Sequence, residues 1–311
     1  MNLAFIREID HGYFAYISAI NVEQLDGEEK QRAATAIRTC YMQGLETLFM
    51  LIGAAIFAPD CVAGYMLKCR PRDLRQMLDS IAKKAKMTNK IQLDQLSWPS
   101  IASALICYKD NDQQDSERTK GLFASLWENF ASDYYDDDNI KEYNSLKHGY
   151  RVHAGGFGMR IGITPRPDAS PETLHNLGSS DYGTSFYTPK LINGGKRDSE
   201  DPHFYLGKIM LNWNPHSIAA ALELISISIN NIILFLEWRN GAASPQTKFL
   251  RPIDDGDYER PWLDRPTLIR SIVETPVRED QIKKFSKDEI KQLIEQKYAS
   301  GESDNPKDSP S

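Results

Sequence analysis

The chain has 311 residues, of which 41% are hydrophobic and 26% charged, so it can build a sizeable apolar core. Its formal net charge of −6 at pH 7 excludes a uniformly basic surface but leaves room for a local basic patch. The N-terminal segment carries acidic residues and does not have the pattern of a signal peptide. The most apolar run, residues 47–59, offers about 12 residues, whereas a bilayer span needs about 20. We therefore expect a soluble, cytoplasmic protein that does not enter a membrane.

Helical periodicity dominates the first half of the chain. Apolar residues recur at steps of three and four over residues 28–58, which predicts one long helix that ends at Pro59. Residues 61–86 continue the helical pattern, with a break expected near Pro71 because proline interrupts a helix. Three further helices are predicted over residues 101–108, with Ser100 as a possible cap, 116–135 and 140–148. Asp136–Asn139 reads as a turn that starts the last of these, and Gly149 as the left-handed residue that ends it.

The pattern changes after residue 150, where Gly, Pro, Ser and Asp become frequent. Short strands are predicted over residues 158–164, 184–188 and 204–213. Residues 216–238 are apolar on nearly every side, which is typical of a central, buried helix. A last amphipathic helix is predicted over residues 286–298, where Ser286 and Glu289 have the spacing of a capping box.

These elements predict a mainly α fold, a helical bundle with a small β-rich insertion before its last core helix. Residues 1–150 would form the first part of the bundle, residues 151–214 the insertion, and residues 215–240 the last core helix. Residues 241–311 would form a peripheral polar tail with one short helix and a disordered C-terminus.

The candidate functional residues lie around the end of the helix predicted at 140–148. They are Asn144, Lys147, His148, Arg151 and His153. Asn144 and His148 are four residues apart, so they share a helix face, and the amide can orient the imidazole. Histidine suits proton transfer near neutral pH, while lysine and arginine suit phosphate, and together they are the minimum equipment for RNA cleavage by the 2′-hydroxyl. Helix ends also carry basic residues for structural reasons, and an Asn144–His148 pair can be purely structural.

The stretch Tyr143-Asn144-Ser145-Leu146-Lys147-His148 resembles the motif of the HEPN superfamily of helical domains. That motif is an arginine, a polar residue, three variable residues and a histidine near the end of a late bundle helix. Asn144 and His148 match the polar and histidine positions, whereas Tyr143 stands where the family has its catalytic arginine. The resemblance implies a helical bundle that binds or acts on RNA or nucleotides, is often dimeric, and works in stress or defence settings.

Two functions from different classes follow. The first is a protein that binds RNA or nucleotides, in which His148 and Asn144 would be catalytic if it is a metal-independent ribonuclease, and Lys147, Arg151 and His153 would contact phosphate. The second is a non-catalytic module for dimerisation or protein interaction. A weaker, third reading is a small-molecule or nucleotide-binding enzyme that uses a cleft between the bundle and the β-rich region. No metal site and no cofactor are expected, because the sequence contains no established ligand or nucleotide-loop pattern.

Three other groups of residues allow more than one interpretation. Glu46 and Arg38 lie in the long apolar helix, where each is either paired across the bundle or placed at an exposed edge, and Glu46 can face His148 or Lys147. The aromatic residues of the β-rich region, Tyr187 among them, can stack on bases or pack a small sheet. Arg151, Lys208 and other basic residues make this region locally basic within an acidic protein.

Overall fold

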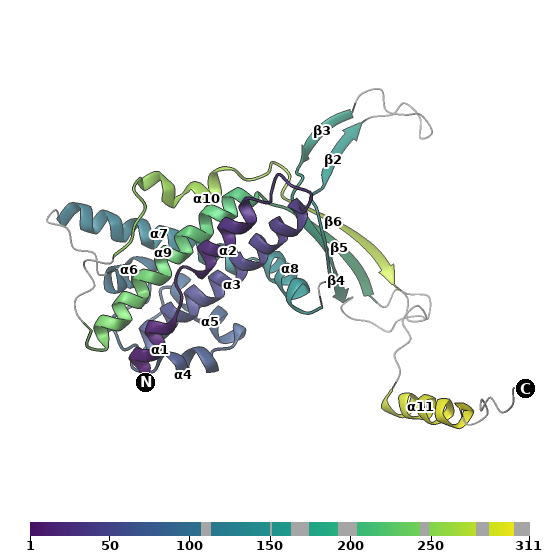
Figure 1. The fold of residues 1–311 in the computed structure, drawn as a ribbon, viewed down its shortest axis with the longest axis horizontal. Helices are drawn as coiled ribbons and strands as arrows, with labels where there is room; N and C mark the ends of the chain where they lie inside the picture. Colours follow the sequence, from purple (N-terminus) through teal and green to yellow (C-terminus); the bar gives the residue numbers. More distant parts are fainter. Residues whose placement is uncertain are drawn as a thin grey trace, which may run out of the picture. The chain divides into compact units, whose positions relative to one another are not determined.

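The computed structural model of the chain describes residues 1–106, 113–149, 151–162, 174–191, 204–242, 249–277 and 286–301 (Figure 1). The chain divides into two compact units. The first comprises Met1–Tyr187 and Lys208–Ile272, and the second comprises Thr188–Gly207 and Val273–Ser311. The predicted C-terminal disorder concerns residues that lie almost entirely outside the described part of the chain.

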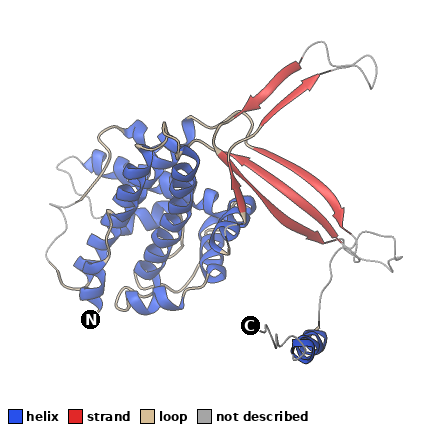
Figure 2. Ribbon diagram, turned by 45° about the vertical axis from the view of Figure 1, so that its right-hand side comes forward, coloured by secondary structure: helices blue, strands red, loops and turns tan. Residues whose placement is uncertain are grey.

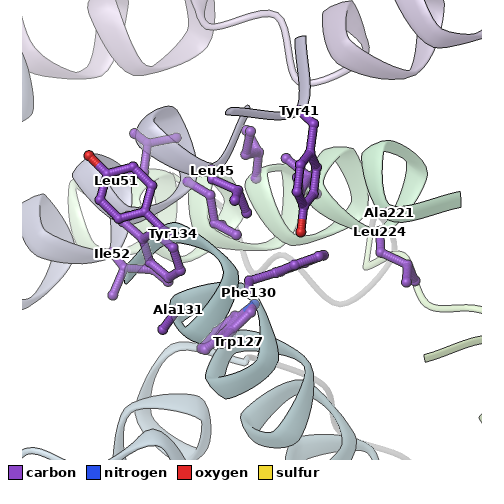
Figure 3. Close-up of a cluster of buried hydrophobic side chains, with 14 of the residues drawn as sticks. Tyr41, Leu45, Leu51, Ile52, Trp127, Phe130, Ala131, Tyr134, Ala221 and Leu224 are labelled. Carbon is purple, nitrogen blue, oxygen red and sulfur yellow. The ribbon is translucent and has the colours of Figure 1, made fainter. Parts of the chain in front are cut away.

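Two long helices form the centre of the first unit. Helix α3 (Lys30–Phe57) packs along α9 (Pro215–Arg239), and α2 (Tyr13–Val22) packs against both. The sequence predicted α3 and α9 within a few residues at each end. By length and composition both could cross a membrane, which is weak evidence, since 72% and 78% of their most apolar windows are buried inside the protein. Figure 3 shows the aromatic centre of this core, where Trp127, Phe130 and Tyr134 of α7 meet side chains of α3 and α9.

The remaining helices surround this pair. In the first unit they are α1 (Asn2–Glu8), α4 (Val62–Lys68), α5 (Pro71–Ala82), α6 (Trp98–Leu105), α7 (Gln113–Tyr135), α8 (Asp137–Lys147) and α10 (Arg260–Leu263). The second unit contains the helix α11 (Lys287–Gly301). A 3₁₀ helix, η2 (Asp255–Tyr258), precedes α10. The expected break at Pro71 is the start of α5, where proline occupies the first turn. The capping box predicted for α11 is present, since the backbone N–H of Ser286 donates to Glu289 and that of Glu289 to Ser286 Oγ.

The strands form two sheets, shown in red in Figure 2. The larger has the order β1-β4-β5-β6, with β1 (Val152–Ala154), β4 (Gly183–Leu191), β5 (Phe204–Asn212) and β6 (Arg270–Val277). The smaller is a hairpin of β2 (Gly158–Gly162) and β3 (Leu174–Ser179). β1 runs antiparallel to β4, with Val152 opposite Phe186 and Ala154 opposite Thr184.

The expectation of a mainly α bundle with a small β-rich insertion is wrong. The fold is mixed α/β, with a four-stranded antiparallel sheet and a second, two-stranded sheet. The sheet also extends beyond the predicted insertion, because β6 comes from residues assigned to the tail. β6 is an edge strand whose side chains are mostly exposed, so its sequence does not show the apolar alternation by which a half-buried strand is recognised.

Residues 249–265 are not part of a peripheral tail, as the sequence suggested, but pack into the core. Tyr258 is only 3% exposed, and its ring packs edge-on against Phe123 at 5.2 Å between centroids. Trp262 of α10 lies 5.3 Å from the ring of Phe130. This segment therefore completes the core of the first unit.

Candidate functional site at helix α8

Helix α8 begins at the predicted turn. The carboxylate of Asp136 accepts hydrogen bonds from the backbone N–H groups of Asp138 and Asn139 at 2.9 and 3.0 Å, which is the geometry of an N-cap. The acidic run is thus used to start a helix. Within the described residues, no group of three or more His, Cys, Asp or Glu side chains is placed to hold a metal ion.

The inner face of α8 carries a buried ion pair. Glu142 is fully buried, and its Oε2 lies 2.8 Å from Nε and 2.7 Å from Nη2 of Arg38 on α3. Its Oε1 accepts from the indole N–H of Trp213 at 3.2 Å and from the hydroxyl of Thr184 on β4. Burial disfavours the charge of Arg38, but the attraction of Glu142 outweighs this and raises the pKa of the guanidinium. One carboxylate therefore joins two helices, a strand and the residue that follows β5.

A second polar cluster lies one residue further along α8. The hydroxyl of Tyr143 donates to Glu46 of α3 at 3.1 Å, and Lys147 Nζ lies 3.6 Å from the same carboxylate and 4.9 Å from the Tyr143 ring centroid. Burial, followed by the charge of Glu46, raises the pKa of Tyr143. Of the partners considered for Glu46, the structure selects Lys147. Tyr143 is a packed side chain in this cluster.

His148 and Asn144 lie on the exposed side of the helix end. His148 is the C-terminal cap of α8, and its backbone N–H donates to the carbonyl of Asn144 at 3.0 Å. Both side chains are exposed, and no hydrogen bond joins the amide of Asn144 to the imidazole, as far as the described residues show. Gly149 follows with φ +94°, as its predicted role in ending the helix requires. The expected orientation of the imidazole by Asn144 is not formed in this structure.

Arg151 and His153 lie at the start of strand β1, which follows α8. Arg151 precedes β1, and its backbone N–H donates to the carbonyl of Ser145 at 2.8 Å. His153 lies in β1 opposite Ser185. Both side chains are exposed, whereas Val152 between them is buried. The five predicted residues are thus near one another along the chain. Of these five, Lys147 lies near a carboxylate, that of Glu46.

Pairing across the bundle was one of the two placements expected for Arg38, but Glu142 was not identified as the partner. The signal was present in the helical spacing. Arg38 falls on the same face of α3 as buried Ala34, Tyr41 and Leu45, at steps of three and four. A charged residue on an apolar stripe requires an opposite charge, and Glu142 stands four residues before buried Leu146 on α8.

The comparisons with known proteins add no family to this description. No family model, curated protein or solved structure matches the chain.

Proposed function

We propose that this protein binds single-stranded RNA without cleaving it, through the outer face of its larger sheet. By outer face we mean the side of β1, β4 and β5 that carries Arg151, His153, Tyr187 and Lys208. His148 and Asn144, at the end of α8, lie a few residues before this face along the chain.

The register of β1 and β4 carries the proposal. Val152 and Phe186 are opposite each other and both are buried, so their neighbours must face the other way. His153 therefore points outward, and the same register continued by one residue places Arg151 opposite Tyr187. The Tyr187 side chain is 50% exposed. A cation and an aromatic ring thus lie side by side on an open surface, which suits phosphate contact and base stacking.

The charge of these strands supports the same function. β1, β4 and β5 contain no aspartate or glutamate, although the whole chain has a formal net charge of −6. In β5, Ile209 and Leu211 are buried, so Lys208 faces the same outer side as Tyr187. Repulsion of a polyanion by carboxylates is therefore weakest at this part of the sheet.

Binding is favoured over cleavage by the state of the motif on α8. The HEPN-like motif needs an arginine beside its histidine, and its place is taken by Tyr143, which is bound to Glu46. Lys147, a possible substitute cation, is held near the same carboxylate. The imidazole of His148 has no side-chain partner to orient it within the described chain, so a general base is not prepared.

The binding test is fluorescence anisotropy with a labelled single-stranded RNA of about 12 nucleotides, within the range of site sizes for such surfaces. We expect salt-dependent binding that Arg151→Glu weakens about tenfold with a shallower salt slope, and that Tyr187→Ala weakens about fivefold or more. Arg72→Glu, an exposed arginine on α5, is the matched control and should bind as the wild type does. The proposal fails if the wild type does not bind, or if Arg72→Glu has the same effect as Arg151→Glu.

The cleavage test uses the same RNA without added metal. In the presence of the wild type or of His148→Ala, the RNA should be cleaved no faster than in the absence of protein. Cleavage by the wild type that His148→Ala abolishes would show a ribonuclease and would contradict the non-catalytic part of the proposal.

A further inference from the structure

A cavity in the first unit is separate from the surface proposed to bind RNA. It encloses about 120 Å³ and opens between α3, α7, α9 and the segment that follows α10. Its walls are largely apolar, with Leu211, Trp213, Ile218 and Ile269 among the lining residues. The polar side chains that reach it include Arg38 and Arg265. All of these residues belong to the first unit.

Arg38 brings an unused hydrogen-bond donor to this cavity. The residue is only 6% exposed. Its Nε and Nη2 bond to Glu142 and Asn139, at 2.8 and 2.7 Å. Nη1 has no acceptor among the described residues. Nη1 is not one of the fully buried polar atoms without a partner, so it is open to the cavity, where a molecule that presents an oxygen can accept a hydrogen bond from it.

The charges around the cavity favour an uncharged acceptor. Arg38 is already neutralised by Glu142, and Arg265 Nη2 lies 3.3 Å from Asp133 Oδ1. The other oxygen of Asp133 accepts from the hydroxyl of Tyr41 at 2.7 Å and from the indole of Trp262 at 3.0 Å. No arginine of this cavity therefore lacks a counter-charge, and a bound anion would be repelled by both Asp133 and Glu142.

The size of the cavity limits the occupant further. A volume of about 120 Å³ lies below the ~300–1,000 Å³ of sites for drug-sized ligands. From these observations we infer that the cavity binds a small uncharged molecule with a carbonyl group on a largely apolar body, such as a primary or cyclic amide. The carbonyl oxygen accepts from Arg38 Nη1, and the body packs against the ring of Trp213 and the aliphatic wall.

Three probes of similar shape separate the possible chemistries. Benzamide is neutral and has a carbonyl, benzoate carries a charge in its place, and ethylbenzene has no acceptor. In saturation-transfer NMR titrations of the full chain over the millimolar range, we expect benzamide to bind about tenfold more tightly than either of the others, because it alone is uncharged and accepts a hydrogen bond from a charged donor. Equal or tighter binding of benzoate or ethylbenzene, or no binding of any probe, would overturn the inference.

A pair of variants on the first turns of α9 locates the site. Ser217 lines the cavity, whereas the exposed neighbour His216 does not. Ser217→Leu should fill part of the cavity and weaken benzamide binding about tenfold or more, while His216→Leu leaves it unchanged. Both variants should bind RNA as the wild type does, so failure of the two proposals can be told apart. Benzamide binding that is insensitive to Ser217→Leu would place the probe elsewhere and refute this site.

Discussion

At the scale of single residues, Tyr143 shows how a side chain within the candidate motif is used for packing. Here a phenol turns inward and is held between a carboxylate of α3 and a lysine of its own helix. The residue is part of the packing between α3 and α8.

The raised pKa of Tyr143 makes a stability prediction with a definite sign. The unfolded phenol has a pKa of about 10, and the folded one a higher value, so the folded state holds the proton more tightly. This contribution to stability is fully present below pH 10 and is lost as the pH rises toward the folded pKa. Tyr143→Phe should lower the free energy of unfolding by about 1–2 kcal/mol at pH 7 and should lose less stability than the wild type above pH 10.

Urea unfolding at pH 7 to 11, followed by fluorescence, measures both effects. Tyr135→Phe, a 46% exposed tyrosine at the end of α7, serves as the control and should change neither. If Tyr143→Phe and the wild type lose the same free energy of unfolding above pH 10, the ionisation of Tyr143 does not contribute to the alkaline loss of stability, and the prediction is wrong.

Single residues also mark the limit of what the sequence could predict about the site. The exposure of His148, Arg151 and His153 follows from their position around Gly149, at a helix end. The pairing of Arg38 with Glu142 joins residues 104 positions apart, and a local pattern contains no information on which carboxylate crosses the core. The spacing shows that a partner is needed but not where it lies.

At the scale of elements, α8 is fixed by charge as much as by apolar contact. Glu142 accepts hydrogen bonds from α3, β4 and Trp213, so the helix and the sheet share one buried carboxylate. Removing one member of a buried pair leaves the other charge without compensation, whereas removing both does not.

The prediction for this pair is non-additive. Glu142→Leu should destabilise the protein by about 3–5 kcal/mol, because Arg38 remains buried and charged. The double variant Arg38→Met with Glu142→Leu should be at least about 1 kcal/mol more stable than the sum of the single changes implies. Thermal and urea unfolding of the four proteins in this cycle give the coupling, and strict additivity would contradict the role assigned to the pair.

Elements with strong periodicity were predicted well, and those defined by long-range pairing were not. Helices α3, α7 and α9 have apolar stripes long enough to identify, and β5 was placed within a residue. The cap of α6 was misplaced, since Ser97 rather than Ser100 begins that helix and Ser100 closes its capping box. β1 has three residues and β3 is largely exposed, so neither carries an apolar alternation strong enough to predict a strand.

At the scale of the whole molecule, the wrong fold class has a single physical origin. Sheet formation depends on which strands meet, and β6 meets β5 across a segment that includes α9 and α10. A sequence pattern reports local burial, and an edge strand has little of it. The polar composition after residue 241 therefore suggested a tail, although Tyr258 and Trp262 lie in or against the core.

Two shortened chains test this division. A chain of residues 1–285, which lacks α11, should unfold within about 2 °C of the full chain, because the described side chains of α11 are exposed. A chain of residues 1–248 loses Phe249, Tyr258 and Trp262 from the core. Since each large aromatic contributes about 3–5 kcal/mol and total stability is about 5–15 kcal/mol, this chain should fail to show a cooperative transition. A cooperative melt of the 1–248 chain at the temperature of the full chain would refute the assignment.

The packing of α3 against α9 has a consequence for folding during translation. α3 is complete at Phe57, but α9 is complete only at Arg239, about 180 residues later. At the usual 5–20 residues per second, a ribosome needs about 10–40 s to supply the missing partner. During that interval the buried face of α3 has no α9 to cover it. The time for which this nascent protein is open to chaperones, and to aggregation, is therefore determined by translation rather than by the rate at which its helices pack.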